Sequence, residues 1–126
     1  MLLIFPPIAK ACEPPAGIAR LAGALQANSI PCRLWDANLE AQLWLLEQPP
    51  TADDTWTSRA WRSRQQHLES LRSPRTYTNL SRYSTAVNDL NRLLQTAGRP
   101  FQTEISLADF RHETLSPVRS QDLLHA

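Results

Sequence analysis

The stretch "LLIFPPIAKACEPPAGIARLAGAL", from Leu2 to Leu25, decides the fold of this chain. Its apolar run, residues 2–5, is stopped at once by two prolines, a pattern typical of a strand that is buried on both faces. Pro14 and Pro15 can then occupy the first positions of a helix, where an amide hydrogen would have no partner in any case. The stretch therefore predicts a strand, a loop and a helix.

The predicted helix has one apolar face and ends near Asn28 and Ser29. Its apolar residues recur three and four apart, the spacing of a buried helical face: Ile18, Leu21, Ala22 and Leu25. Gly17 and Gly23 lower the helix propensity, so we expect a close approach to a neighbouring element at both positions.

A second short strand follows in "PCRLWDANLE", residues 31–40. It contains Cys32, Leu34 and Trp35 and ends at Asp36. A strand, a helix and a strand in this order form a βαβ unit, whose two strands are parallel and whose crossover is right-handed. The first third of the chain therefore predicts the beginning of an α/β sheet.

Three helices are expected between residues 39 and 98. The first carries Leu39, Leu43 and Leu46 on one face and stops at Pro49. The second runs from about Asp53 to Arg72. The third starts near Thr76 or Thr78 and ends at Gly98 and Pro100, where the chain can no longer continue a helix. Thr51 or Asp53 can cap the second helix.

The third of these helices carries a narrow apolar seam that is suited to packing on another helix. The seam residues are Leu80, Tyr83, Val87, Leu90 and Leu94. Residues 101–110 predict a further extended segment with Ile105 and Leu107 on one face. Ser120 is the expected cap of a last helix that begins near the end of the chain. We therefore expect a single domain over residues 1–126 that is truncated at Ala126.

The composition limits the partners and the cellular environment that we expect for the protein. The chain has 126 residues and a formal net charge of +1, which gives no excess for nucleic-acid binding. Two cysteines, Cys12 and Cys32, are too few for a disulfide framework, so we expect a reduced, cytoplasmic setting. No run approaches the roughly 20 apolar residues of a membrane span, and a membrane partner is not expected.

The common catalytic motifs are absent from the sequence. It contains no P-loop, no Gly-x-Gly-x-x-Gly after the first strand, no nucleophile elbow and no zinc-protease pattern. His67, His112 and His125 are far apart among polar residues, and a surface position is expected for all three. No acid/base constellation for a small standalone enzyme can be identified.

Candidate binding residues lie at the ends of the two strands. Asp36 and Asn38 follow the second strand, at the edge where open α/β sheets bind ligands. An acid there can hold a ribose hydroxyl, yet both residue types are also common in turns and helix caps, and we favour the structural role. Cys12, near a helix N-terminus that could lower the pKa of a thiol, has no base in view and is not expected to be catalytic.

Tryptophans and arginines each allow two interpretations. The tryptophans could line a flat cofactor or close a core: Trp35, Trp44, Trp56 and Trp61. The arginines of the middle segment could form a solvated face or meet an acidic or phosphate-bearing partner: Arg59, Arg62, Arg64, Arg72 and Arg75. The core and the solvated face are the expected outcomes.

Residues 2–40 resemble the N-terminal region of radical SAM proteins that carry a cobalamin-binding-like, Rossmann-type domain ahead of their catalytic barrel. Residues 107–126 are loosely similar to the segment that follows in such proteins. The positions of the first region that match the family pattern are Pro6, Pro7, Pro15, Gly17, Leu21, Ala22, Leu25, Asp36 and Asn38.

Two departures limit what the resemblance implies. Two cysteines cannot supply the three ligands of the family's 4Fe-4S cluster, so this chain does not perform the radical reaction. S-adenosylmethionine and the 4Fe-4S cluster would belong to the missing part of the parent protein. The Asp-x-His-x-x-Gly motif that gives cobalt a histidine is also absent, although some radical SAM cobalamin proteins lack it.

The resemblance and the residues together give these expectations. The fold class is α/β, with a partial Rossmann-like βαβ unit, a short, mainly parallel sheet and a large helical insertion at about residues 39–98. The function is that of a noncatalytic platform for a cofactor, cobalamin, or a substrate, with the downstream radical SAM domain as partner. The alternative is a helical protein interaction or dimerisation module without a cofactor. The expected cofactor-binding residues are Pro7, Cys12, Pro15, Gly17, Asp36 and Asn38.

Overall fold

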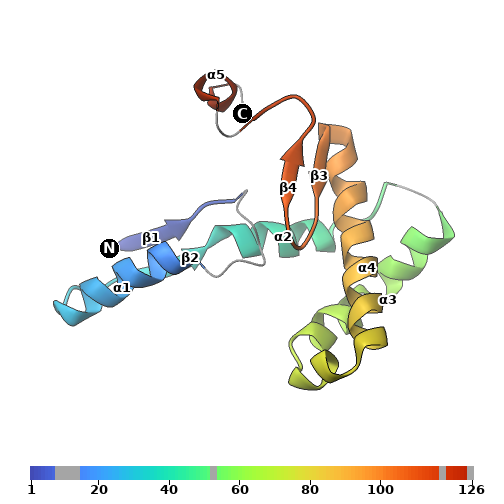
Figure 1. The fold of residues 1–126 in the computed structure, drawn as a ribbon, viewed down its shortest axis with the longest axis horizontal. Helices are drawn as coiled ribbons and strands as arrows, with labels where there is room; N and C mark the ends of the chain where they lie inside the picture. Colours follow the sequence, from blue (N-terminus) through green and yellow to red (C-terminus); the bar gives the residue numbers. More distant parts are fainter. Residues whose placement is uncertain (8–14, 52–53, 117–118, 125–126) are drawn as a thin grey trace.

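The computed structural model describes residues 1–7, 15–51, 54–116 and 119–124. The molecule is an elongated α/β arrangement with a βαβ unit at one end and a helical unit at the other, joined by α2 (Figure 1). The elements, in chain order, are β1 Leu2–Phe5, α1 Ala16–Ala27, β2 Arg33–Asp36, α2 Ala37–Glu47, α3 Thr55–Leu71, the 3-10 helix η1 Pro74–Thr78, α4 Leu80–Gly98, the 3-10 helix η2 Arg99–Phe101, β3 Thr103–Ile105, β4 Phe110–His112 and α5 Ser120–Leu123.

The βαβ unit is present as predicted. β1 and β2 pair in parallel, with Leu2 opposite Arg33 and Phe5 opposite Asp36. α1 connects them and runs back along the pair (Figure 1). In the described part of the chain this sheet has only two strands, because β3 and β4 pair with each other in a second sheet. The prediction of one short, mainly parallel sheet is therefore right for its first two strands and wrong for the third.

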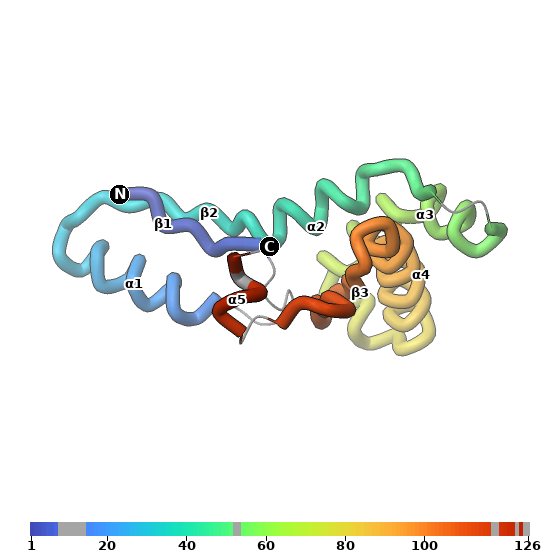
Figure 2. The backbone as a smooth tube through the Cα atoms, turned by 90° about the horizontal axis from the view of Figure 1, so that it is seen from above, coloured from blue at the N-terminus to red at the C-terminus, as the bar shows by residue number. Residues whose placement is uncertain are grey.

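The first strand is not buried on both faces. Leu3 and Phe5 are half-buried, whereas Leu2 and Ile4 are 55% and 48% exposed. Figure 2 shows α1 along one side of the β1–β2 pair and no described element on the other. The expectation was wrong because one helix can cover only one face of a two-stranded sheet.

Only part of the predicted apolar face of α1 is buried. Ala22 is buried, but Leu21 is 58% exposed. A Cβ atom added at Gly17 or Gly23 would meet nothing within 4 Å. The close approach that was predicted at these two glycines is therefore wrong, because α1 borders only a narrow sheet.

The main core lies in the helical unit. α3 and α4 pack along one another, and the end of α2 and the β3–β4 hairpin close the core against α4 (Figure 1). The predicted insertion is thus not a cover for the sheet but the main folded body of the described chain. The buried residues of its core cluster are Leu46, Ala60, Leu90, Leu93 and Leu94.

The apolar seam of α4 is correct only in its second half. Leu90 and Leu94 are fully buried, but Leu80 is 76% exposed and Tyr83 is also exposed. The buried face of α4 begins at Ala86, one and a half turns into the helix. The periodicity predicted the direction of the face and not the point at which α3 begins to cover it.

The starts of both long helices differ from the predictions. α4 starts at Leu80 and not at Thr76 or Thr78, because the Oδ1 atom of Asn79 accepts a hydrogen bond from the backbone N–H of Arg82 at 3.0 Å. Residues 74–78 form η1 instead. The N-cap of α3 is Asp54 and not Thr51. The other candidate cap, Asp53, lies outside the described residues.

Asp54 fixes the beginning of α3 to the middle of α4. Its carboxylate accepts hydrogen bonds from the backbone N–H of Thr57 at 2.9 Å and from the Thr57 hydroxyl at 2.6 Å. Arg92 donates to Asp54 Oδ2 at 2.7 Å and to Thr57 Oγ1 at 3.0 Å. The cap is therefore also a contact between the two long helices.

The end of α4 touches the hairpin closely. β3 and β4 are antiparallel, with Thr103 opposite His112, where one extended segment was expected. The backbone N–H of Leu107 donates to Asn91 Oδ1 of α4 at 2.8 Å. A Cβ atom added at Gly98 would fall on the carbonyl oxygen of Thr103 and lie 2.8 Å from its hydroxyl. Gly98 is therefore the glycine that the packing requires.

The last described helix begins without the predicted cap. Ser120 lies inside α5, and the N-cap position is held by Arg119, whose side chain makes no cap hydrogen bond. The carboxylate of Asp122 instead accepts a hydrogen bond from the backbone N–H of Ser116 at 2.8 Å. The turn before α5 is thus held by a residue within the helix.

Gly98→Ala should lower the free energy of unfolding by about 1–3 kcal/mol, because the added methyl group overpacks the contact with the Thr103 backbone. Gly23→Ala is the matched control. A Cβ atom has open space there, and alanine should stabilise the helix by about 0.5–1 kcal/mol. Urea unfolding of the three proteins measures both changes. Equal effects at the two glycines would contradict the close contact.

Asp54→Asn should destabilise the protein at neutral pH and have a smaller effect in acid. Hydrogen bonds from Thr57 and then from Arg92 hold the pKa of Asp54 well below its usual range. Since the unfolded value is about 3.9, the stabilisation is complete above that pH and is lost as the pH falls towards the folded pKa. Urea unfolding from pH 7 to pH 2 should show the two proteins converging. A difference that does not vary with pH would contradict this role.

Candidate functional site

The carboxyl ends of the two parallel strands form one edge of the βαβ unit. β1 ends at Phe5, opposite Asp36, and α2 begins at the next residue, Ala37. α1 runs antiparallel to the strands, so its first turn, at Ala16, lies towards the same edge (Figure 1). Two helix N-termini, with backbone N–H groups that lack partners in the helix, therefore meet at this edge.

Asp36 caps α2. Its Oδ1 atom accepts a hydrogen bond from the backbone N–H of Leu39 at 2.9 Å, which is the structural role favoured by the sequence. Asn38, two residues further, is 4% exposed. Of the two polar residues predicted at the strand end, only Asp36 is thus accessible to a ligand.

The other predicted binding residues divide into three groups. Pro15 is the half-buried N-cap residue of α1, and Gly17 is exposed in its first turn, so both lie at the edge that Asp36 shares. Pro7 is exposed beyond the end of β1. Cys12 lies outside the described residues. Among the described residues, no atom lies within 4 Å of a Cβ atom added at Gly17.

The described residues provide no metal centre. They contain no group of three or more histidine, cysteine, aspartate or glutamate side chains that could hold a metal ion. Cys32 is a half-buried free thiol with its Sγ atom 3.9 Å from the carbonyl oxygen of Ala22.

Comparison with family models, with curated proteins and with solved structures finds no match to this chain. In the part of the chain that the structure describes, no helix is both long and apolar enough to cross a membrane.

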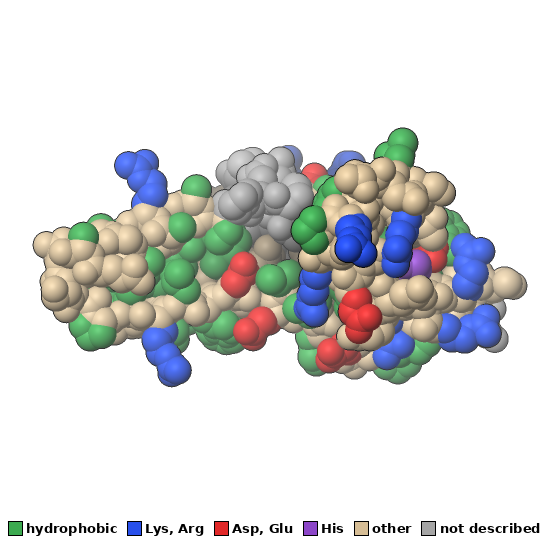
Figure 3. All heavy atoms as spheres, turned by 90° about the horizontal axis from the view of Figure 1, so that it is seen from below, with side chains coloured by type: hydrophobic (Ala, Val, Ile, Leu, Met, Phe, Trp, Pro, Cys, Tyr) green, Lys and Arg blue, Asp and Glu red, His purple; other side chains and the backbone are tan. Residues whose placement is uncertain are grey.

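The βαβ end and the adjoining α2 expose many large apolar side chains. Figure 3 shows hydrophobic side chains gathered at the βαβ end of the molecule. Contiguous apolar surface of this kind marks an interaction site more often than single exposed residues do. The exposed residues of this region are Met1, Leu2, Ile4, Leu21, Ile30, Leu34, Trp35, Leu39 and Trp44.

The tryptophans do not form a common cluster. Trp35 donates from Nε1 to Glu40 at 2.8 Å on the βαβ side, and Trp56 donates to Asp89 at 2.7 Å in the helical unit. Trp61 packs against the core beneath Arg64, whose guanidinium carbon lies 3.6 Å from the ring centroid. Core closure therefore holds for Trp61, whereas Trp35, Trp44 and Trp56 are exposed.

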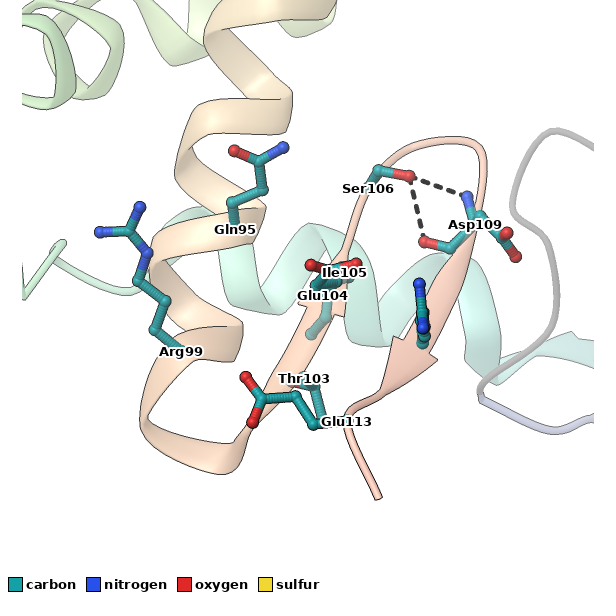
Figure 4. A pocket seen from close by; sticks show the side chains of 9 residues that line it. Gln95, Arg99, Thr103, Glu104, Ile105, Ser106, Asp109 and Glu113 are labelled. Atoms are coloured by element: carbon teal, nitrogen blue, oxygen red, sulfur yellow. Dashed lines mark hydrogen bonds between the residues drawn. The ribbon is translucent and has the colours of Figure 1, made fainter. Parts of the chain in front are cut away.

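A hollow that the sequence did not predict lies between the end of α4 and the hairpin. It has a volume of about 630 Å³, and its charged side chains are of both signs (Figure 4). The Ser106 hydroxyl bonds the backbone of Asp109 within the turn. Mixed exposed charges do not favour one ligand class. The lining residues are Gln95, Arg99, Thr103, Glu104, Ile105, Ser106, Asp109, Arg111 and Glu113.

The histidines are not simple surface residues. His112 Nδ1 accepts hydrogen bonds from the backbone N–H groups of Thr114 at 3.1 Å and Leu115 at 3.0 Å. The His67 side chain is 14% exposed and bonds Asp89. The surface prediction is therefore wrong for His67, whose partner lies 22 residues away and leaves no local signal. His125 lies outside the described residues.

Asp36→Ala should lower the free energy of unfolding by about 1 kcal/mol, because α2 loses its cap. Asp36→Asn should retain most of the stability, since asparagine caps as well as aspartate. Comparing the urea unfolding of the two variants separates the contribution of the cap hydrogen bond from that of the carboxylate charge. Equal losses in both variants would show that the carboxylate charge, and not the cap, stabilises this end of α2.

Proposed function

We propose that this chain is a noncatalytic platform domain, similar to the N-terminal cobalamin-binding-like domain of radical SAM proteins. The observation that supports it best is the parallel β1–β2 pair with Asp36 and the first turn of α1 at its carboxyl edge. This is the edge at which open α/β sheets bind ligands. The family pattern falls on the same residues, including Pro15 and Gly17.

Cobalamin has features that such an edge can hold. Its nucleotide tail carries a phosphate, and the N-terminus of α1, which has no side-chain cap, favours an anion. Asp36 uses Oδ1 for the α2 cap and has a second carboxylate oxygen that can accept a hydroxyl or amide donor. The exposed backbone at Gly17 allows a bulky ring to approach α1. When bound, cobalamin would supply a cobalt centre to the parent protein.

The proposed partner is the radical SAM domain of the same parent chain. The outer face of the β1–β2 pair exposes Leu2, Ile4 and Trp35. Leu2 and Ile4 are two residues apart on β1, and Trp35 lies opposite Ile4 on β2, so the three side chains share one face of the sheet. Apolar side chains in this arrangement are stabilised when another protein surface covers them. The apolar face supports docking and requires no catalytic group on this chain.

Titration of the protein with hydroxocobalamin tests the proposal. We expect a saturable change in the visible spectrum and coelution of cobalamin with the protein in gel filtration. Asp36→Asn should weaken binding several-fold while keeping the α2 cap, and Asp109→Asn, on the distant hairpin, is the matched control. A protein that elutes free of cobalamin, with an unchanged spectrum, would refute the platform function.

A second candidate is the helical interaction module. Tyr77 of η1 and Leu80 and Tyr83 at the start of α4 are exposed, and the two tyrosine rings lie 5.6 Å apart. They form an apolar patch that α3 leaves uncovered. If the module is a dimer, the elution volume in the same gel filtration should depend on protein concentration, and Leu80→Ser should remove that dependence. A constant monomeric volume would refute it.

A further inference from the structure

A buried carboxylate on α4 determines the protonation of a histidine on α3. Asp89 is 4% exposed and accepts hydrogen bonds from Trp56 Nε1 at 2.7 Å and from His67 Nε2 at 3.1 Å. Arg59 lies 3.7 Å from the same carboxylate. An ionised carboxylate only accepts hydrogen bonds, so the proton of a neutral His67 must be on Nε2.

The second nitrogen of His67 is therefore available to a ligand. No hydrogen bond joins Nδ1 to any described residue, and no buried side-chain nitrogen or oxygen of the described chain lacks a partner. Nδ1 must then be accessible to solvent. His67 lines a pocket of about 230 Å³, and we assign its free nitrogen to that pocket.

The hydroxyl groups of the pocket are already used as donors. Thr85 donates to the carbonyl oxygen of Ser81 at 2.9 Å. Thr76 donates to the carbonyl oxygen of Ser70 at 2.6 Å, so in the 2.9 Å contact between their hydroxyls Ser70 must be the donor. Neither Ser70 nor Thr85 has a proton left for a ligand.

Three groups of the pocket keep unused hydrogen-bonding capacity. The side chains of Gln66 and Arg82 make no hydrogen bond or ion pair with any described residue, and His67 has Nδ1 free. No acidic side chain lines the pocket. An arginine, an amide and an imidazole without an opposing carboxylate favour an anionic ligand.

We propose that this pocket binds a small oxyanion, a phosphate or carboxylate group, between Arg82 and His67. Arg82 supplies the charged donors, and His67, protonated on Nδ1, supplies another while Asp89 stabilises the imidazolium from the other side. A volume of about 230 Å³ corresponds to roughly eight waters, which suits a small ion and not a nucleotide.

An oxyanion accepts a hydrogen bond from Nδ1 only when that nitrogen carries a proton, so the bound form has both ring nitrogens of His67 protonated. Asp89 of α4 bonds the ring, Arg82 of α4 lines the same pocket, and Arg59 of α3 lies against the carboxylate. The site lies in the helical unit, and it does not depend on a ligand at the carboxyl edge.

Long-range ¹H–¹⁵N NMR of the histidine rings in the whole chain tests the site. Inorganic phosphate and acetate are titrated separately at constant ionic strength, at pH 7.5 and at pH 6. We expect the His67 Nδ1 signal to shift saturably with at least one of the two anions. The anion that binds more tightly, phosphate or acetate, shows whether the site prefers a phosphate or a carboxylate group.

Arg82→Gln should weaken the binding about tenfold, the loss expected for one charge-assisted contact. Arg62→Gln is the matched control, because Arg62 is an exposed arginine of α3 that does not line the pocket. Arg82 is exposed as well, so both variants should fold, and circular dichroism checks this. The proposal is overturned if neither anion shifts His67 Nδ1, or if Arg82→Gln binds as tightly as Arg62→Gln.

Discussion

A buried carboxylate is stable only where donors surround it, and Asp89 imposes that requirement on the whole helical unit. Its donors, Trp56 and His67, both come from α3, so the bonds fix the position of α3 along α4. Three residues further along α4, Arg92 bonds Asp54 at the start of α3. Apolar packing brings the helices together, and these polar contacts restrict how they can slide.

The two ends of the molecule differ in how far their side chains are buried and hydrogen-bonded. The helical end has a closed core around Leu90 and Leu94, and its buried polar groups have partners within the described chain. The βαβ end keeps its backbone pairing but leaves Ile4, Trp35 and other apolar side chains in solvent. Buried packing is therefore concentrated at the helical end, whereas the βαβ end exposes apolar side chains.

Local patterns predicted the elements but not the contacts between them. The parallel βαβ unit and the long helices follow from proline positions and apolar periodicity, and so does the Asp36 cap. Asp54 also bonds Arg92, 38 residues away, and no local rule predicts a contact at that distance. The same limit explains why the contacts of Gly98 with Thr103 and of His67 with Asp89 were not predicted.

α2 belongs to both ends of the molecule. Its first residue follows Asp36 at the carboxyl edge, and Leu46 in its last turn is buried in the core of the helical unit. A continuous helix of 11 residues is about 16 Å long and resists bending. α2 therefore connects the two ends of the molecule rigidly, so any tilt of its first turn must be absorbed where Leu46 meets α4.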